Sequence, residues 1–224
     1  MSGTLKSIDL FAGCGGLSLG LEKAGFQHLF AIEAHPHAFA TYHHNLVKGR
    51  PYEKRWPQWL DCSANDILEV IRQKERNLKG LRGQVDLIAG GPPCQGFSMN
   101  GRRDPKDPRS QLINAYFEFV KLIRPKAVLM ENVQGFTSMP HDQFGKYPEF
   151  AKAKLEELGY VAFDSVLLAS EFGVPQRRPR YILVAFQAGD FPGVDPIRQL
   201  KENRRQYLNS IGLRGGAISA VEAL

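Results

Sequence analysis

Short apolar runs of strand length alternate along this chain with longer amphipathic stretches of helix length. A strand covered on both faces of a parallel sheet is apolar throughout, and its parallel neighbour is reached only through a crossover, usually a helix. The alternation therefore predicts an α/β fold with a doubly wound, mostly parallel sheet. The expected strands are residues 7–12, 29–32, 85–89, 127–130, 161–168 and 181–186.

Helix signals fill the stretches between these strands. Apolar residues recur at helical spacing over residues 110–123, and Asp66 stands where its carboxylate can accept the free N–H groups of a first turn. The last two expected strands are joined by a turn rich in Pro and Arg, so we expect them to pair antiparallel at an edge of the sheet. The expected helices are residues 17–24, 38–46, 67–75, 110–123 and 150–158, with a loop over 48–59.

Length and composition favour one large domain in a reducing compartment. The chain has 224 residues, of which 43% are hydrophobic and 23% charged, and no stretch resembles a signal peptide or a membrane span. Cys14, Cys62 and Cys94 form no CxxC pair, which argues against a disulfide framework or a zinc ribbon. The formal net charge of +6 mildly favours a polyanionic partner. We expect a catalytic domain over residues 1–190 and a basic tail over 191–224.

A glycine turn follows the first expected strand. Its glycines allow the backbone to approach a ligand at a helix N-terminus, and Glu33, twenty residues after Gly13, is placed to accept hydrogen bonds from ribose hydroxyls. A dinucleotide fingerprint would need glycine where Ser18 stands, and no Gly-Lys-Ser/Thr follows as in a P-loop. The turn therefore favours an adenosine ligand without pyrophosphate. The alternative is a tight turn that only begins a helix.

Cys94 lies in a rigid turn, Gly-Gly-Pro-Pro-Cys-Gln-Gly-Phe-Ser, after the expected strand 85–89. A structural cysteine is normally found among apolar neighbours on a strand or helix, whereas a nucleophile needs a rigidly held backbone and a setting that favours the thiolate. Arg102 and Arg103 can supply positive potential there. Cys94 is therefore the candidate nucleophile, and Cys14 is interpreted as packing within the glycine turn.

Two further charged groups follow or precede expected strands. Glu131 comes after four apolar residues, so its carboxyl is expected to act as an acid or hydrogen-bond donor at the end of a buried strand. The alternative is a structural carboxylate that accepts backbone N–H groups. Residues 176–180, Gln-Arg-Arg-Pro-Arg, are presented from an extended turn because Pro179 ends any helix. Their arginines suit phosphate, although such a run by itself is more often a solvated surface.

Histidines and aromatic residues carry weaker signals. Four histidines lie close together in the sequence: His35, His37, His43 and His44. No Cys or carboxylate completes a recognisable ligand spacing with them, so exposed or capping roles are favoured over a metal site. Three aromatic residues are expected in the core of the helix 110–123: Tyr116, Phe117 and Phe119. The stronger candidates follow expected strands, where ligands bind in open α/β sheets, so we expect them to share one pocket.

Taken in order, these segments resemble the motifs of the DNA cytosine-5 methyltransferase family, over about residues 7–186. The matching stretches are Asp-Leu-Phe-Ala-Gly-Cys-Gly-Gly (9–16), Glu33, Asp66-Ile67, Pro-Cys-Gln (93–95), Glu-Asn-Val (131–133) and Gln-Arg-Arg-Pro-Arg (176–180). Each match alone is a modest signal, whereas the ordered set is specific. The resemblance implies the Rossmann-like fold of S-adenosylmethionine-dependent methyltransferases, with DNA as the partner.

The resemblance also implies roles for individual residues. The catalytic residues would be Cys94, Glu131, Arg178 and Arg180. S-adenosyl-L-methionine would be bound by Phe11, Ala12, Gly13, Cys14, Gly15, Gly16, Glu33, Asp66, Ile67, Pro93 and Leu112. DNA would be contacted by Gln95, Ser98, Arg102 and Arg103.

In the family mechanism, the Cys94 thiolate would add to carbon 6 of a cytosine, which makes carbon 5 nucleophilic enough to accept a methyl group. Glu131 would engage N3 and the exocyclic amine, while Arg178 and Arg180 would orient the base and hold phosphate. The base must first leave the duplex, at a cost of roughly a few kcal/mol.

The C-terminal end departs from the family pattern. Residues 218–224 resemble the segment before the family's variable target-recognition region, and that region and the last motifs do not follow. The chain is expected to be an enzyme that a separate chain completes, or a silent module that binds only cofactor or DNA. RNA cytosine is an alternative substrate. A nicotinamide-dependent oxidoreductase is opposed by Ser18 and the Pro-Pro-Cys turn. The expected location is the cytoplasm, at the nucleoid if the source is bacterial.

Overall fold

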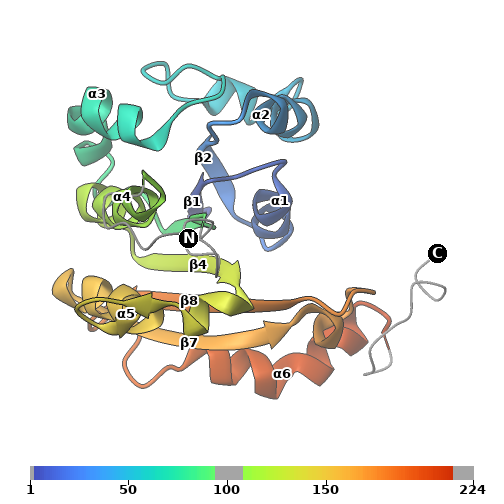
Figure 1. Cartoon of the computed structure of the whole chain (residues 1–224). Helices are drawn as coiled ribbons and strands as arrows, with labels where there is room; N and C mark the ends of the chain where they lie inside the picture. Colours follow the sequence, from blue (N-terminus) through green and yellow to red (C-terminus); the bar gives the residue numbers. More distant parts are fainter. Residues whose placement is uncertain (1–2, 94–107, 214–224) are drawn as a thin grey trace. The chain divides into compact units, whose positions relative to one another are not determined.

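A computed structural model describes residues 3–93 and 108–213 of the chain. Its contacts divide the chain into two compact units, Met1–Met130 and Glu131–Leu224. Cys94, Gln95, Ser98, Arg102 and Arg103 lie outside the described residues, as do residues 214–224. The two units are taken in turn below (Figure 1).

The first unit is built on parallel strands. Strand β1 (Lys6–Leu10) pairs with β2 (Gln27–Ile32) on one side and with β3 (Leu87–Gly90) on the other, and β3 pairs with β4 (Ala127–Val133). All three pairings are parallel. The helices between them are α1 (Gly16–Lys23), α2 (Pro36–Tyr42), α3 (Ile67–Lys79) and α4 (Pro108–Ile123), with short turns η1 (His43–Val47) and η2 (Glu53–Arg55).

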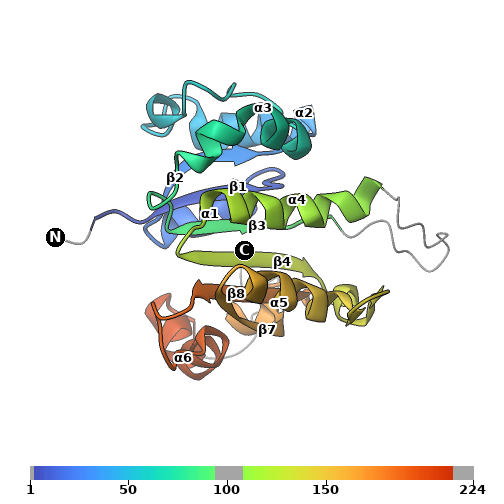
Figure 2. The same cartoon turned by 90° about the vertical axis from the view of Figure 1, so that its left-hand side faces the viewer.

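Helices cover both faces of these strands, which explains why the strands are apolar throughout. Leu21 of α1 packs against Leu87 and Ala89 of β3. Figure 1 shows α3 and α4 on the opposite face, where the ring centroids of Phe119 in α4 and Phe30 in β2 are 6.3 Å apart. Figure 2 shows α4 running alongside β1 and β3. The aromatic residues expected in the helix core, Tyr116, Phe117 and Phe119, are all buried.

The second unit contains an antiparallel pair of strands. Strand β7 (Tyr160–Leu168) pairs with β8 (Pro179–Gln187) over their whole length, so the expected antiparallel pairing is confirmed. Helix α5 (Tyr147–Glu157) packs on β7 through buried residues, and the loop between β7 and β8 begins with η4 (Ala169–Phe172). The remaining elements are η3 (Gln134–Ser138), β5 (Pro140–His141), β6 (Gly145–Lys146) and α6 (Pro196–Ser210).

Most expected elements are present, with three differences. Strand β4 continues to Val133, so Glu131 lies within the strand and not after its end. The helix expected over residues 38–46 is α2 followed by a wider turn in which the Lys48 N–H donates to the His43 carbonyl. Helix α6 lies in a stretch where we expected only a basic tail, because just two of its residues, Ile197 and Leu208, are buried. Within the described residues, no helix is long and apolar enough to cross a membrane.

Gly90 fixes how β3 meets β1 just before the Pro-Pro-Cys turn. A Cβ atom at position 90 would overlap the carbonyl oxygen of Leu10 and would lie 3.1 Å from Cε2 of Tyr116. The neighbouring Gly91 N–H donates to the same carbonyl at 3.3 Å. The backbones of the two strands are therefore closer than any side chain at position 90 permits.

We expect Gly90→Ala to lower the free energy of unfolding by about 1–3 kcal/mol, the usual cost of overpacking. Urea denaturation of the variant and the wild type measures the difference. Gly20→Ala is the matched control, because a Cβ at this helical glycine meets open space and alanine favours helix, so it should be neutral or gain up to about 1 kcal/mol. Equal stability of Gly90→Ala and wild type would contradict the close approach.

Candidate cofactor and active site

The turn after β1 adopts the left-handed conformation at three positions. Phe11 has φ 58°, Gly13 has φ 56° and Gly15 has φ 93°. Such a φ is uncommon for a residue with a side chain, and strained backbone of this kind concentrates at functional sites. The sharp path brings the chain from the end of β1 directly into the first turn of α1.

Glu33 holds this turn against the end of β2. Its Oε2 accepts the Gly13 N–H at 2.8 Å and its Oε1 accepts the His35 N–H at 2.7 Å. The Ala12 N–H also donates to the carbonyl of Ile32 at 3.0 Å. Each carboxylate oxygen can accept more than one hydrogen bond, so the half-buried Glu33 retains the capacity to accept ribose hydroxyls.

The glycines of the turn serve different purposes. A Cβ at Gly15 would lie 2.5 Å from Cδ1 of Leu46 and 2.9 Å from Cδ2 of Tyr42, so this glycine permits packing between α1 and the α2 region. A Cβ at Gly13 would meet nothing within 4 Å, so the space beside it is open to a ligand. The interpretation of Cys14 as turn packing is wrong, because the Cys14 side chain is exposed.

Asp66 begins α3 as its N-cap, as the sequence predicts. Its Oδ1 accepts the N–H groups of Leu68 at 2.8 Å and Glu69 at 3.2 Å. The preceding Asn65 N–H donates to the carbonyl of Glu33 at 2.8 Å, which ties the start of α3 to the end of β2. Ile67 has a buried side chain, so a ligand at this point would meet its backbone.

A buried carboxyl beneath the glycine turn was missed by sequence reasoning. Asp9 on β1 is 1% exposed, and its Oδ2 accepts the Ser18 hydroxyl at 2.6 Å, while its Oδ1 has no hydrogen-bond partner in the described part of the chain. Burial raises the pKa of Asp9 to about 7, although hydrogen bonds from the Ser18 hydroxyl and backbone N–H oppose the shift. A charged residue inside an apolar run was the signal that could have identified it.

Ser18 links Asp9 to further buried polar groups. Its hydroxyl lies 3.2 Å from the Tyr42 hydroxyl, which lies 3.3 Å from that of Tyr52. The His28 ring contacts the Ser18 carbonyl through Nε2 at 2.8 Å and the Ser7 hydroxyl through Nδ1 at 2.9 Å. The residue that breaks the dinucleotide fingerprint is therefore the centre of a network that fixes α1 on the sheet.

The approach to the candidate nucleophile is described only up to its prolines. Pro92 is buried and Pro93 is partly buried after the end of β3. Leu112 is partly exposed in α4. Cys94 and its DNA-contact candidates lie outside the described residues, so their positions stay predictions.

In the second unit, Glu131 of β4 forms an ion pair with Arg180 of β8, with Arg180 Nε 2.7 Å from Glu131 Oε1. Arg180 Nη1 also donates to the Pro179 carbonyl at 2.8 Å. Arg178 is exposed just before β8. The structure therefore brings two of the four expected catalytic residues together, through a charge-assisted hydrogen bond that fixes the orientation of the carboxylate.

The histidines do not form a metal centre in the described part of the chain. His35 and His37 are exposed beside each other, with ring centroids 5.5 Å apart. Across residues 3–93 and 108–213, no group of three or more His, Cys, Asp or Glu side chains could hold a metal ion.

Comparison with known sequences identifies the family. The profile of the C-5 cytosine-specific DNA methylases matches residues 5–211, most of the chain and both units. The chain belongs to this family. Its members are S-adenosylmethionine-dependent methyltransferases, so the expected fold class and cofactor are confirmed.

Several relatives of this C-5 cytosine-specific DNA methylase are bacterial modification enzymes. Type II methyltransferase M.AgeI of Thalassovita gelatinovora is 43% identical over 193 residues, which cover 86% of this chain and 41% of that protein. M1.HphI of Haemophilus parahaemolyticus is 38% identical, with 83% and 47% covered. The chain thus spans less than half the length of these relatives.

Solved structures agree with this assignment. A protein described as a DNA modification methyltransferase encoded within an E. coli prophage is 30% identical, with a TM-score of 0.61 over 82% of this chain and 47% of that one. The S. pombe Dnmt2 methyltransferase has a TM-score of 0.64 at 23% identity, over 88% and 54%, and so shares the fold.

The cofactor of this methylase family fits the residues present. S-adenosylmethionine carries an adenosine, for which Glu33 and Asp66 offer carboxylate oxygens beside the open space at Gly13. It carries no phosphate. Asp9 already uses the hydroxyl and backbone N–H of Ser18 in the first turn of α1, where dinucleotide enzymes place the pyrophosphate.

We expect Asp9 to make stability depend on pH. Its folded pKa is raised, so its contribution is fully present below its unfolded value of 3.8 and is lost as pH rises to about 7. Asp9→Asn should remove this fall, which is on the order of a few kcal/mol. Urea unfolding of both proteins across this pH range measures the effect, and parallel stability profiles would contradict it.

We expect Glu33→Ala to weaken S-adenosylmethionine binding by about 10- to 100-fold, because charge-assisted hydrogen bonds to ribose and to the Gly13 backbone are lost. Calorimetric titration measures the affinity. The control is Glu75→Ala, an exposed glutamate that pairs with Lys79 on α3 and should leave affinity unchanged. Unchanged affinity in Glu33→Ala would reject the assignment.

Proposed function

We propose that this chain is the cofactor-binding and catalytic part of an enzyme that methylates carbon 5 of cytosine in DNA. The observation that carries the proposal is the family match across residues 5–211, which contains the glycine turn, Glu33, Asp66, Cys94, Glu131 and the arginines in order. The Glu131–Arg180 ion pair supports it, because it joins two motifs that are far apart in the sequence.

The cofactor is held by the first unit. The strained turn from Phe11 to Gly16 presents its backbone, Glu33 accepts the ribose hydroxyls, and Asp66 with Ile67 meets the adenine. Pro93 and Leu112 complete the proposed set. S-adenosylmethionine supplies an electrophilic methyl group when it is bound.

Cys94 activates the cytosine ring. The thiolate sulfur bonds to carbon 6, and the electrons of the 5,6 double bond make carbon 5 nucleophilic. After carbon 5 has gained the methyl group, a base removes its proton, the double bond re-forms and the sulfur leaves as the thiolate. The chain therefore ends the cycle with Cys94 unchanged.

Glu131 stabilises the negative charge that develops on the ring when the sulfur adds. Its carboxyl engages N3 and the exocyclic amine of the base, and Arg180 holds that carboxyl in one orientation at 2.7 Å. Arg178, exposed at the end of the turn before β8, binds phosphate beside the base. Gln95, Ser98, Arg102 and Arg103 contact the DNA from which the base has been flipped out.

A second proposal concerns the parts of the relatives that this chain does not match. Since the chain aligns with 41% of M.AgeI and 47% of M1.HphI, we propose that target recognition is supplied from outside residues 1–224 by further polypeptide, including a separate chain. The enzyme would act in the cytoplasm, at the nucleoid if the source is bacterial.

DNA that carries 5-fluorocytosine tests the chemistry directly. Fluorine at carbon 5 cannot leave as a proton, so the Cys94 adduct persists after methyl transfer and survives denaturing electrophoresis. We expect this complex from the wild type with S-adenosylmethionine and none from Cys94→Ala, which should still bind S-adenosylmethionine by calorimetry. An RNA substrate of the same sequence runs in parallel.

Cys62→Ala is the matched control, because Cys62 is an exposed cysteine outside every proposed site. It should form the adduct as the wild type does. An adduct in Cys94→Ala, or its loss in Cys62→Ala alone, would overturn the assignment of the nucleophile. An adduct with RNA but not with DNA would overturn the substrate.

A further inference from the structure

The loop that carries Arg178 is in close contact with α6. Gly173, directly after η4, has φ 84°, and a Cβ built on it would lie 2.5 Å from Cδ1 of Leu213 and 3.3 Å from Cδ2 of Leu208. Leu208 is 1% exposed. The loop backbone therefore rests on two leucines at a distance that only glycine permits.

The end of α6 is shaped to provide this support. Gly212 has φ 81° and its N–H donates to the Asn209 carbonyl at 3.1 Å, while the Leu213 N–H donates to the Leu208 carbonyl at 2.8 Å. This pair of bonds is a Schellman motif, in which the chain reverses and an apolar contact forms across the helix end. The reversal places Leu213 beside Leu208 and against Gly173.

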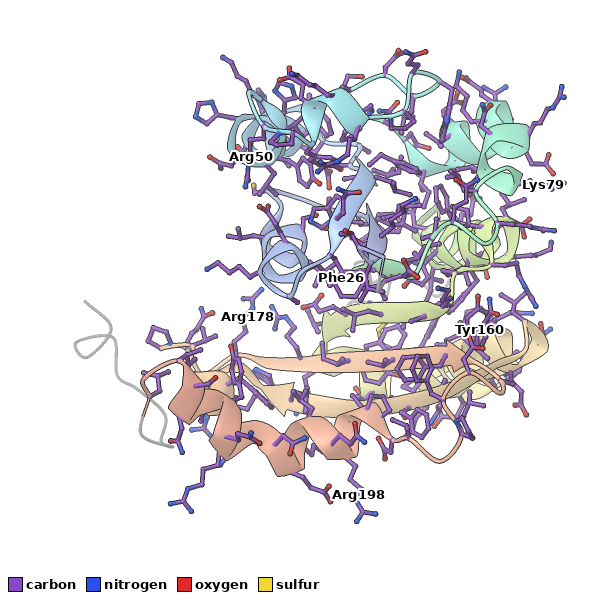
Figure 3. All side chains as sticks on the ribbon, turned by 180° about the vertical axis from the view of Figure 1, so that it is seen from behind. Phe26, Arg50, Lys79, Tyr160, Arg178 and Arg198 are labelled. Carbon is purple, nitrogen blue, oxygen red and sulfur yellow. The ribbon has the colours of Figure 1, made fainter. Side chains whose placement is uncertain are left out.

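Further contacts connect the helix to the arginines. Arg204 of α6 lies 3.6 Å from Glu171 in η4. Where the loop closes, the Ala169 N–H donates to the Arg178 carbonyl at 3.0 Å, and Leu168 is opposite Pro179 in the strand register. Figure 3 shows Arg178 at the end of the hairpin near the C-terminal end of α6, whereas Arg198 points outward from that helix.

We infer that α6 is a positioning helix, in which Leu208 and Leu213 clamp the loop at Gly173 and so hold Arg178 in place. The inference rests on the proposed function, in which Arg178 binds phosphate beside the target base. Leu208 and Leu213 touch neither substrate nor cofactor and act through the loop. A helix in a stretch of polar and basic sequence thus has a defined task.

The test compares Leu208→Ala with Leu208→Met, which keeps the apolar contact, and with Tyr207→Ala, which removes an exposed neighbour on the same helix. In Leu208→Ala we expect amide hydrogen exchange at Ala169 to be about tenfold faster, and trypsin cleavage after Arg177 to accelerate. Exchange in the β7 and β8 amides should stay slow. The other two variants should match the wild type.

Kinetics then test positioning separately from packing. In Leu208→Ala we expect the KM for DNA to rise about tenfold while the dissociation constant for S-adenosylmethionine is unchanged, with Leu208→Met restoring the wild-type KM. Unchanged exchange at Ala169, or equal loosening of β7 and β8, overturns the clamp. Faster exchange with an unchanged KM for DNA overturns the positioning role. A wild type that methylates no DNA refutes the proposed function, and the exchange result then still decides the clamp.

Discussion

The first unit depends on two carboxyl groups that bind backbone and side-chain donors where β1 and β2 meet the first helix. Glu33 accepts the Gly13 and His35 N–H groups, and Asp9 accepts the Ser18 hydroxyl beneath the turn. Such buried donors would each cost free energy if they were left without a partner. The strained φ values of Phe11 and Gly13 persist because these bonds hold the turn from both sides.

The same two groups determine what the pocket can accept. In dinucleotide enzymes the first turn of the helix after β1 is an anion site for pyrophosphate. Here Asp9 engages that turn through Ser18, and Glu33 adds a second carboxylate beside the glycines. A cofactor that offers ribose hydroxyls and a positive charge is favoured over one that offers phosphates, which agrees with membership of a methylase family.

The sequence predicted the elements whose signal is local and missed those that depend on distant contacts. Apolar runs identified the strands, and Asp66 identified the start of α3 because a cap acts on the residues that follow it. Asp9 was read as part of a motif, since nothing local shows that Ser18 lies above it. Helix α6 gave little amphipathic signal, because its support of Gly173 uses mainly Leu208 and the reversed Leu213.

Calorimetric titration of the whole chain with S-adenosylmethionine and, separately, with NAD tests the central claim most directly. The two carboxyl groups at the glycine turn predict saturable binding of S-adenosylmethionine at one site and no measurable binding of NAD. Binding of NAD as tight as that of S-adenosylmethionine would contradict the account, as would a chain that is folded by circular dichroism and binds neither.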